Sequence, residues 1–140
     1  MLNNKEIPVG LSIPLMRGPH GYFNQNFNTL DQAYSNIKNL LLTIYGERRM
    51  NVNFGSSIYS LVFEQVTDPN ELISSLTTQI NSLIFQYFPY IDITNLNIGF
   101  LDTNINMINI EIEFQLKNST NKLFGKSETR TINTLISANI

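Results

Sequence analysis

The stretch from Ile105 to Asn118, INMINIEIEFQLKN, carries the clearest structural pattern in the chain. Every second residue is apolar, and the set is Ile108, Ile110, Ile112, Phe114 and Leu116. The residues between them are Asn109, Glu111, Glu113, Gln115 and Lys117. Because successive side chains of a strand point to opposite faces of a sheet, this alternation predicts a half-buried antiparallel strand.

Two further strands are predicted around this one. Residues 91–101 form a preceding strand, whose inward set is Leu96, Ile98 and Phe100. Turn-forming residues 102–104 would close a hairpin between the two strands. Ser127–Ser137 is predicted to be a third strand. It carries too little apolar surface for a central strand, so we expect it at an edge, with the polar residues Glu128, Thr129, Arg130 and Thr131.

Upstream of the strands, apolar residues recur with helical spacing. The stripe is Leu30, Tyr34, Ile37, Leu41 and Ile44. It predicts a helix over about Leu30–Tyr45. Thr29 and Gln32 have the spacing of a capping box, and Gly46 stands where a left-handed cap would end the helix.

A second helix has stronger boundary signals. In TDPNEL, Asp68 suits the N-cap and Pro69 suits the first helical position. Pro89 should end this helix at or before Phe88, because proline pushes the preceding residue out of the helical region.

Together these elements predict an α+β fold, with two main helices packed on one face of a small, mainly antiparallel sheet of about three strands. Residues 1–28 contain scattered prolines and glycines without a helical period. We expect them to form an extended N-terminal arm that packs on a larger partner. Residues 29–140 would then form a single domain.

Composition excludes several functional classes. The chain has 140 residues, a formal net charge of −2 and no cysteine. Its lysines and arginines are scattered, so we expect no nucleic-acid partner. No apolar run approaches the ~20 residues of a membrane span, so we expect no membrane partner. Neither a cofactor nor a metal site is predicted.

The candidate catalytic residues lack the surroundings that catalysis needs. Glu111 and Glu113 share one face of the predicted strand, but that face is the polar one, where nothing would lower the dielectric around a catalytic acid. His20 is the only histidine and stands in a predicted turn without the partners of a triad or a metal site. We therefore expect the chain not to be an enzyme.

The most distinctive loop is YGERRMNVNFGSSIYSLVFE, residues 45–64. Arg48 and Arg49 could pair with carboxylates through their forked donors, and Glu47 and Glu64 are the nearest acids in the chain. One interpretation is an internal ion pair that fixes the loop, and the other is a charged grip on a neighbouring protein. We favour the first for Arg48 and leave Arg49 open.

An aromatic cluster closes the second predicted helix, with Phe85, Tyr87, Phe88 and Tyr90. It is either the end of a core helix or a docking surface, since aromatic residues are enriched at interface hot spots. Core packing is the simpler interpretation.

Several motifs in order resemble one known family. The run LLLTIYGERRMNVNFGSSIYSLVFE, with GLSIPL and GPHGYF before it and the helix–proline–strand order after it, is similar to the baseplate-wedge, or sheath-initiator, family of contractile-tailed phages. That family includes a baseplate component of type VI secretion systems. The resemblance covers residues 10 to about 116.

The resemblance implies a structural virion protein, assembled in the host cytoplasm into the multi-subunit ring of the tail baseplate. Its partners would be other wedge proteins and the tail sheath protein. Templating of the first sheath ring would be β-augmentation, in which an incoming strand pairs with an exposed sheet edge. The alternative is a lysozyme-like peptidoglycan hydrolase of the tail, because members of this family have carried that label.

One departure from the family bears on docking. Many members have Glu-Pro-Arg at the end of the second helix, and that motif is associated with docking onto the wedge. Here the sequence is YFPYI, in which Phe88 and Tyr90 flank Pro89. Docking at this place would therefore be aromatic and apolar instead of ionic. The predicted partner-binding residues are Arg48, Arg49, Phe88, Pro89, Tyr90, Glu128, Thr129, Arg130 and Thr131.

Overall fold

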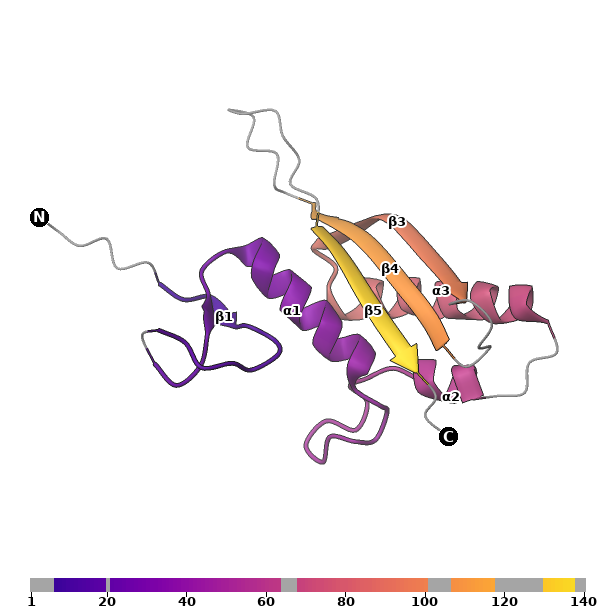
Figure 1. Cartoon of the computed structure of the whole chain (residues 1–140), viewed down its shortest axis with the longest axis horizontal. Helices are drawn as coiled ribbons and strands as arrows, with labels where there is room; N and C mark the ends of the chain where they lie inside the picture. Colours follow the sequence, from indigo (N-terminus) through magenta and orange to yellow (C-terminus); the bar gives the residue numbers. More distant parts are fainter. Residues whose placement is uncertain (1–6, 20, 64–67, 101–106, 118–129, 138–140) are drawn as a thin grey trace, which may run out of the picture.

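The structure is a computed structural model that describes residues 7–19, 21–63, 68–100, 107–117 and 130–137. The helices are α1 (Thr29–Leu42), α2 (Ile58–Phe63) and α3 (Pro69–Tyr87). The strands are β1 (Gly10–Leu11), β2 (Gln25–Asn26), β3 (Ile91–Phe100), β4 (Met107–Leu116) and β5 (Arg130–Ser137). Figure 1 shows α3 behind a sheet of β3, β4 and β5, with α1 beside β5 and β1 beyond the start of α1.

The main sheet is antiparallel throughout, in the order β3-β4-β5. Ile112 of β4 lies opposite Leu96 of β3 on one side and Ile132 of β5 on the other. The strands predicted from alternation are therefore confirmed, and so is the α+β class. The predicted turn at 102–104 and the predicted strand residues before Arg130 lie outside the described residues.

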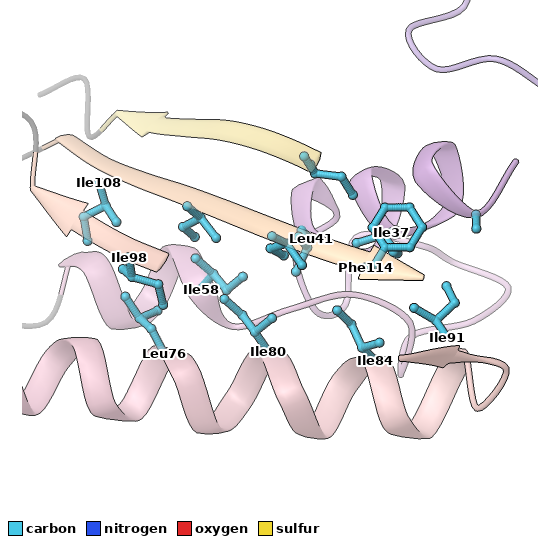
Figure 2. Close-up of a cluster of buried hydrophobic side chains, with 14 of the residues drawn as sticks. Ile37, Leu41, Ile58, Leu76, Ile80, Ile84, Ile91, Ile98, Ile108 and Phe114 are labelled. Atoms are coloured by element: carbon cyan, nitrogen blue, oxygen red, sulfur yellow. The ribbon is translucent and has the colours of Figure 1, made fainter. Parts of the chain in front are cut away.

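The core lies between the helices and one face of this sheet, as Figure 2 shows. The alternating residues Ile108, Ile110, Ile112 and Phe114 are all fully buried, whereas Leu116 is half-buried. The helices contribute Ile37, Leu41, Leu76, Ile80 and Ile84. Each such side chain contributes about 1.5–3 kcal/mol when it leaves water. The apolar residues that alternate along β4 thus pack in one cluster with those that recur at helical spacing along α1 and α3.

Both predicted boundaries of α1 are wrong in position. Asn28 is the N-cap, because its side chain accepts a hydrogen bond from the backbone N–H of Leu30 at 3.0 Å. The helix ends at Leu42, where Thr43 turns extended and its hydroxyl donates to the Asn39 carbonyl at 2.6 Å. Gly46 has the expected left-handed φ of +83°, but it bends the following loop and does not cap the helix.

The boundaries predicted for α3 are confirmed. Asp68 is the N-cap and accepts from the Asn70 N–H at 2.9 Å, and Pro69 opens the helix. Phe88 is the C-cap. Between the two main helices, the apolar run after Gly55 forms the short helix α2, whose Ile58 is buried in the core.

The N-terminal arm is not simply extended, because β1 and β2 pair antiparallel with Gly10 opposite Asn26. Buried Asn26 anchors the arm on α1, where its amide nitrogen lies 3.1 Å from the Ser35 hydroxyl. The same hydroxyl accepts from the Ile13 N–H at 3.3 Å. The arm's large apolar side chains are mostly exposed, among them Ile7, Leu15, Met16, Tyr22 and Phe23. The anchor is therefore polar, and the apolar surface is left open.

Candidate interaction surfaces

The loop between α1 and α2 is closed at its base by backbone contacts. The Ser56 N–H donates to the Thr43 carbonyl at 2.8 Å, and Ile44 and Ser56 form a parallel bridge. Buried Ser56 also donates its hydroxyl to the Leu41 carbonyl at 2.8 Å. Gly55 makes this approach possible, because a Cβ on it would lie 2.7 Å from the Thr43 oxygen. The loop therefore leaves and rejoins the fold at one fixed point.

Arg48 holds the side of the loop, but not through the predicted ion pair with a carboxylate. Its Nη2 donates to the Asn39 side-chain oxygen at 3.1 Å, and its guanidinium lies 4.1 Å from the centre of the Phe54 ring. The Glu47 carboxylate instead accepts from the Ile44 N–H at 3.1 Å. Among the described residues, Arg48 has no acidic partner. Because Glu47 is tied to the backbone, the amide of Asn39 and the ring take its place beside Arg48. Glu64 lies outside the described residues.

A second clamp joins the loop to the end of α3. The rings of Phe54 and Tyr87 meet edge to face with centroids 5.4 Å apart. The Tyr87 hydroxyl donates to the Asn53 carbonyl at 2.5 Å. Tyr87 thus holds the loop, and nothing in its helical spacing indicated this partner.

The tip of the loop is exposed beyond these clamps. Met50 is 100% exposed and Val52 is 55% exposed. Arg49 is also exposed, and it has no hydrogen-bond or ion-pair partner in the described part of the chain. The loop projects from the end of α1 in Figure 1.

The aromatic cluster divides between core and surface. Phe88 is half-buried and packs against the core, whereas Pro89 and Tyr90 are exposed. The Phe88 and Tyr90 rings meet edge to face at 6.1 Å. Phe85 is 74% exposed, and the Lys117 ammonium lies 5.9 Å from its ring centre. The interpretation as core packing therefore holds for Phe88 but not for Phe85 or Tyr90.

The free edge of β5 is the third surface. β5 pairs with β4 without a break from Arg130 to Ser137, and no other described strand lies beyond it. Thr131 is exposed and Ile132 is buried, so the strand keeps the predicted alternation there. Glu128 and Thr129 lie outside the described residues, as does the Arg130 side chain.

The predicted non-catalytic acids lie on the face of the sheet that turns away from the helices. Glu111 and Glu113 are half-buried there, and their β3 neighbours are Asn97 and Asn95. Within the described residues, no group of acids or histidines could hold a metal ion. No helix in the same part of the chain is long and apolar enough to cross a membrane. His20 lies outside that part.

These features define a small α+β domain in which no other described strand covers the outer side of β5, and in which side-chain contacts hold an exposed loop. The chain belongs to the baseplate wedge protein gp25 family, which it matches over residues 31–121. The family is structural, and it supplies the baseplates of contractile tails and of type VI secretion systems. No curated protein matches the chain.

Three solved structures share the fold at low sequence identity. A Geobacter sulfurreducens protein, provisionally named a tail lysozyme, has a TM-score of 0.61 and 16% identity, and the match covers 81% of this chain and 96% of that one. The anti-feeding prophage baseplate contains a chain with a TM-score of 0.57 and 18% identity, with coverage of 93% and 85%. The baseplate complex of a type VI secretion system contains one with a TM-score of 0.59 and 14% identity, with coverage of 78% and 93%.

Sequence reasoning missed the residues that hold these surfaces in place. Asn39 and Asn53 accept the hydrogen bonds from Arg48 and Tyr87 that hold the loop. Asn26 and Ser35 anchor the arm on α1. The only available signal was weak, namely small polar residues within or beside apolar stripes, such as Ser35 in α1.

Proposed function

We propose that this protein is a baseplate component of a contractile phage tail that docks on the wedge and starts the sheath by β-strand augmentation. It would be incorporated into the baseplate ring in the host cytoplasm and remain in the virion. Family membership and the baseplate assemblies among its structural neighbours support the part of this proposal that concerns the baseplate. The part that concerns the sheath rests on the geometry of β5.

The observation that carries the sheath step is the regular edge of β5, beyond which no other described strand lies. An edge strand has unpaired N–H and C=O groups along its outer side, and an incoming strand satisfies them. The buried face of β4 and β5 is held against the helices by residues such as Ile112 and Ile132. The template would therefore be rigid before a sheath strand arrives, which lowers the entropic cost of pairing.

The opposite edge, β3, is a poorer template. Its register against β4 shifts between Ile93 and Asn95, which marks a bulge or irregularity. Asp92 on the same strand lies 4.0 Å from the Lys117 ammonium. Bulges and charges are devices by which natural sheets discourage pairing at an edge. The comparison of the two edges therefore favours β5 as the template for an incoming strand.

Docking on the wedge would use apolar surface. Phe88 and Tyr90, on either side of the retained Pro89, replace the two charged residues of the family's motif with aromatic rings, and Tyr90 is 41% exposed. The arm adds exposed apolar side chains such as Leu15 and Met16. Burial of such surface would supply the affinity without an ion pair.

Proline substitution on β5 tests the sheath step. Successive residues of an antiparallel strand direct their N–H groups to alternate sides, so Thr131 and Thr134 point theirs to opposite sides. Of Thr131→Pro and Thr134→Pro, one therefore removes a donor of the β4 ladder and the other removes a donor of the free edge. The ladder variant should lose about 1–3 kcal/mol of unfolding free energy. The edge variant should stay folded but block sheath polymerisation on complete baseplates.

The matched controls are Thr131→Val and Thr134→Val, which retain the N–H group. Circular dichroism melts identify which proline variant is folded like its control, and electron microscopy of tails then gives sheath length. Sheaths of normal length on baseplates that contain the folded proline variant would rule out β5 as the template.

A separate assay tests the hydrolase alternative. Purified protein is incubated with peptidoglycan, beside the Glu111→Gln and Glu113→Gln variants. We expect no release of soluble fragments from any of the three. Release by the parent protein that either substitution abolishes would replace the structural function with an enzymatic one.

A further inference from the structure

The tip of the α1–α2 loop has no role in the proposed pairing of β5 with the sheath. Its exposed residues, Arg49, Met50 and Val52, contribute nothing to the core. Yet the loop beneath them is fixed at its base by Ser56, at one side by Arg48 and at the other by Tyr87. An exposed loop that served only as a connection would not need three separate restraints.

The restraints keep the tip in one conformation before any partner arrives. Inside the loop, the Gly46 N–H donates to the Val52 carbonyl at 3.0 Å, and the Phe54 N–H donates to the Asn51 carbonyl at 3.1 Å. Binding through a preorganised loop avoids the entropic cost of ordering it, so a small contact area can give useful affinity. Such a construction is what an insertion into a partner requires.

Charge indicates the chemistry of the partner. Residues 44–57 contain one glutamate and two arginines, a net charge of +1 in a chain whose net charge is −2. The Glu47 carboxylate is occupied by the Ile44 N–H, and Arg48 is stacked on Phe54. Arg49 is the cation that remains available beside the fully exposed Met50. A partner surface that complements these two side chains would have an apolar notch for Met50 and acidic residues around it for Arg49.

We propose that Arg49 and Met50 insert into an acidic, apolar-lined notch on a neighbouring baseplate protein. Methionine and arginine are both enriched in protein interfaces, where a flexible thioether fills an irregular pocket and a guanidinium pairs with a carboxylate. A nucleic acid is a poorer occupant, because one available cation neutralises one phosphate and Met50 would have no role. This contact is a docking contact, separate from the sheath edge on β5.

Charge reversal at the tip tests the contact in whole particles. Arg49→Glu should reduce incorporation of the protein into purified baseplates by about tenfold or more, because like charges would then face each other. Arg49→Lys, which keeps the charge, should be incorporated well, and Met50→Ser should show an intermediate loss. All three should melt with the parent protein, since both side chains are exposed. Normal incorporation of Arg49→Glu and Met50→Ser would overturn the proposal.

Photocrosslinking identifies the occupant. Benzoylphenylalanine replaces Met50 in assembled tails, with exposed Ser75 of α3 as the control position. We expect position 50, but not position 75, to crosslink to an acidic segment of another baseplate protein. A lysine that replaces an acidic residue of that partner segment should restore the incorporation of Arg49→Glu. Crosslinks to nucleic acid, to a second copy of this chain or to a segment without acids would each overturn it. Sheath length is scored only on baseplates that contain the protein, so this test and the proline test fail independently.

Discussion

Gly55 should be far more sensitive to substitution than Gly46, although both stand in the same loop with positive φ. Gly55 has a φ of +135° and Gly46 a φ of +83°. A Cβ at Gly55 would meet the Thr43 carbonyl oxygen at 2.7 Å and the Ile44 carbonyl carbon at 3.0 Å. A Cβ at Gly46 would meet nothing within 4 Å. Gly46→Ala is therefore a control for backbone strain alone.

The magnitudes follow from these two environments. Gly46→Ala should cost about 1–2 kcal/mol of unfolding free energy, the penalty of a left-handed L-residue. Gly55→Ala carries strain of about 1–3 kcal/mol, and the clash with backbone atoms adds about 1–3 kcal/mol. The clash also opposes the Thr43–Ser56 contact that closes the loop. Against a domain stability of about 5–15 kcal/mol, the second loss is large.

Urea unfolding, followed by circular dichroism, measures both variants beside the parent protein. The midpoint should fall in the order parent, Gly46→Ala, Gly55→Ala, with similar slopes if the denatured states are alike. If Gly55→Ala is no less stable than Gly46→Ala, the close approach of Gly55 to Thr43 is not a feature of the folded protein, and the rigid base of the loop is lost with it.

Two further predictions concern the aromatic motif and the arm. Phe88→Ala should cost about 2–3 kcal/mol, less than a fully buried phenylalanine, and exposed Tyr90→Ala less than about 1 kcal/mol. Both should reduce incorporation into baseplates, and normal incorporation of Tyr90→Ala would argue against docking there. Ser35→Ala removes the acceptor shared by Ile13 and Asn26, so it should cost about 1–3 kcal/mol. Hydrogen exchange at Ile13 should then accelerate relative to α1, and unchanged exchange would show that this contact does not hold the arm.

The elements that sequence predicted best are those whose own pattern specifies them. The alternation from Ile108 to Phe114 requires one buried face, and the Asp68–Pro69 start of α3 satisfies its first N–H groups locally. The start of α1 was misplaced by one residue because Asn28 and Thr29 are both good caps, and only the geometry selects between them. Its end was misplaced because Thr43 leaves the helix to pair with Ser56, a contact across the loop.

The candidate surfaces were predicted less completely, for a related reason. Arg48 was singled out correctly as a residue that fixes the loop, but its partner is the neutral Asn39, nine positions away. Tyr87 lies 34 positions from the carbonyl that it binds, so no spacing rule could have found it. Charge suggests which residues seek partners, but it does not choose between a carboxylate, an amide and an aromatic ring. That choice depends on which of them the fold brings near.

The two proposed contacts differ in how much they depend on the core, and this difference makes them separable. The β5 edge rests on buried Ile132, so any change that reaches the core also alters the template. The loop tip rests instead on Asn39, Tyr87 and Ser56, and the hydrogen bonds of Asn39 and Tyr87 are both exposed. Loosening those two bonds should lower the affinity of the tip while the sheet stays folded. Wedge docking can therefore be weakened without disturbing the strand on which the sheath would start.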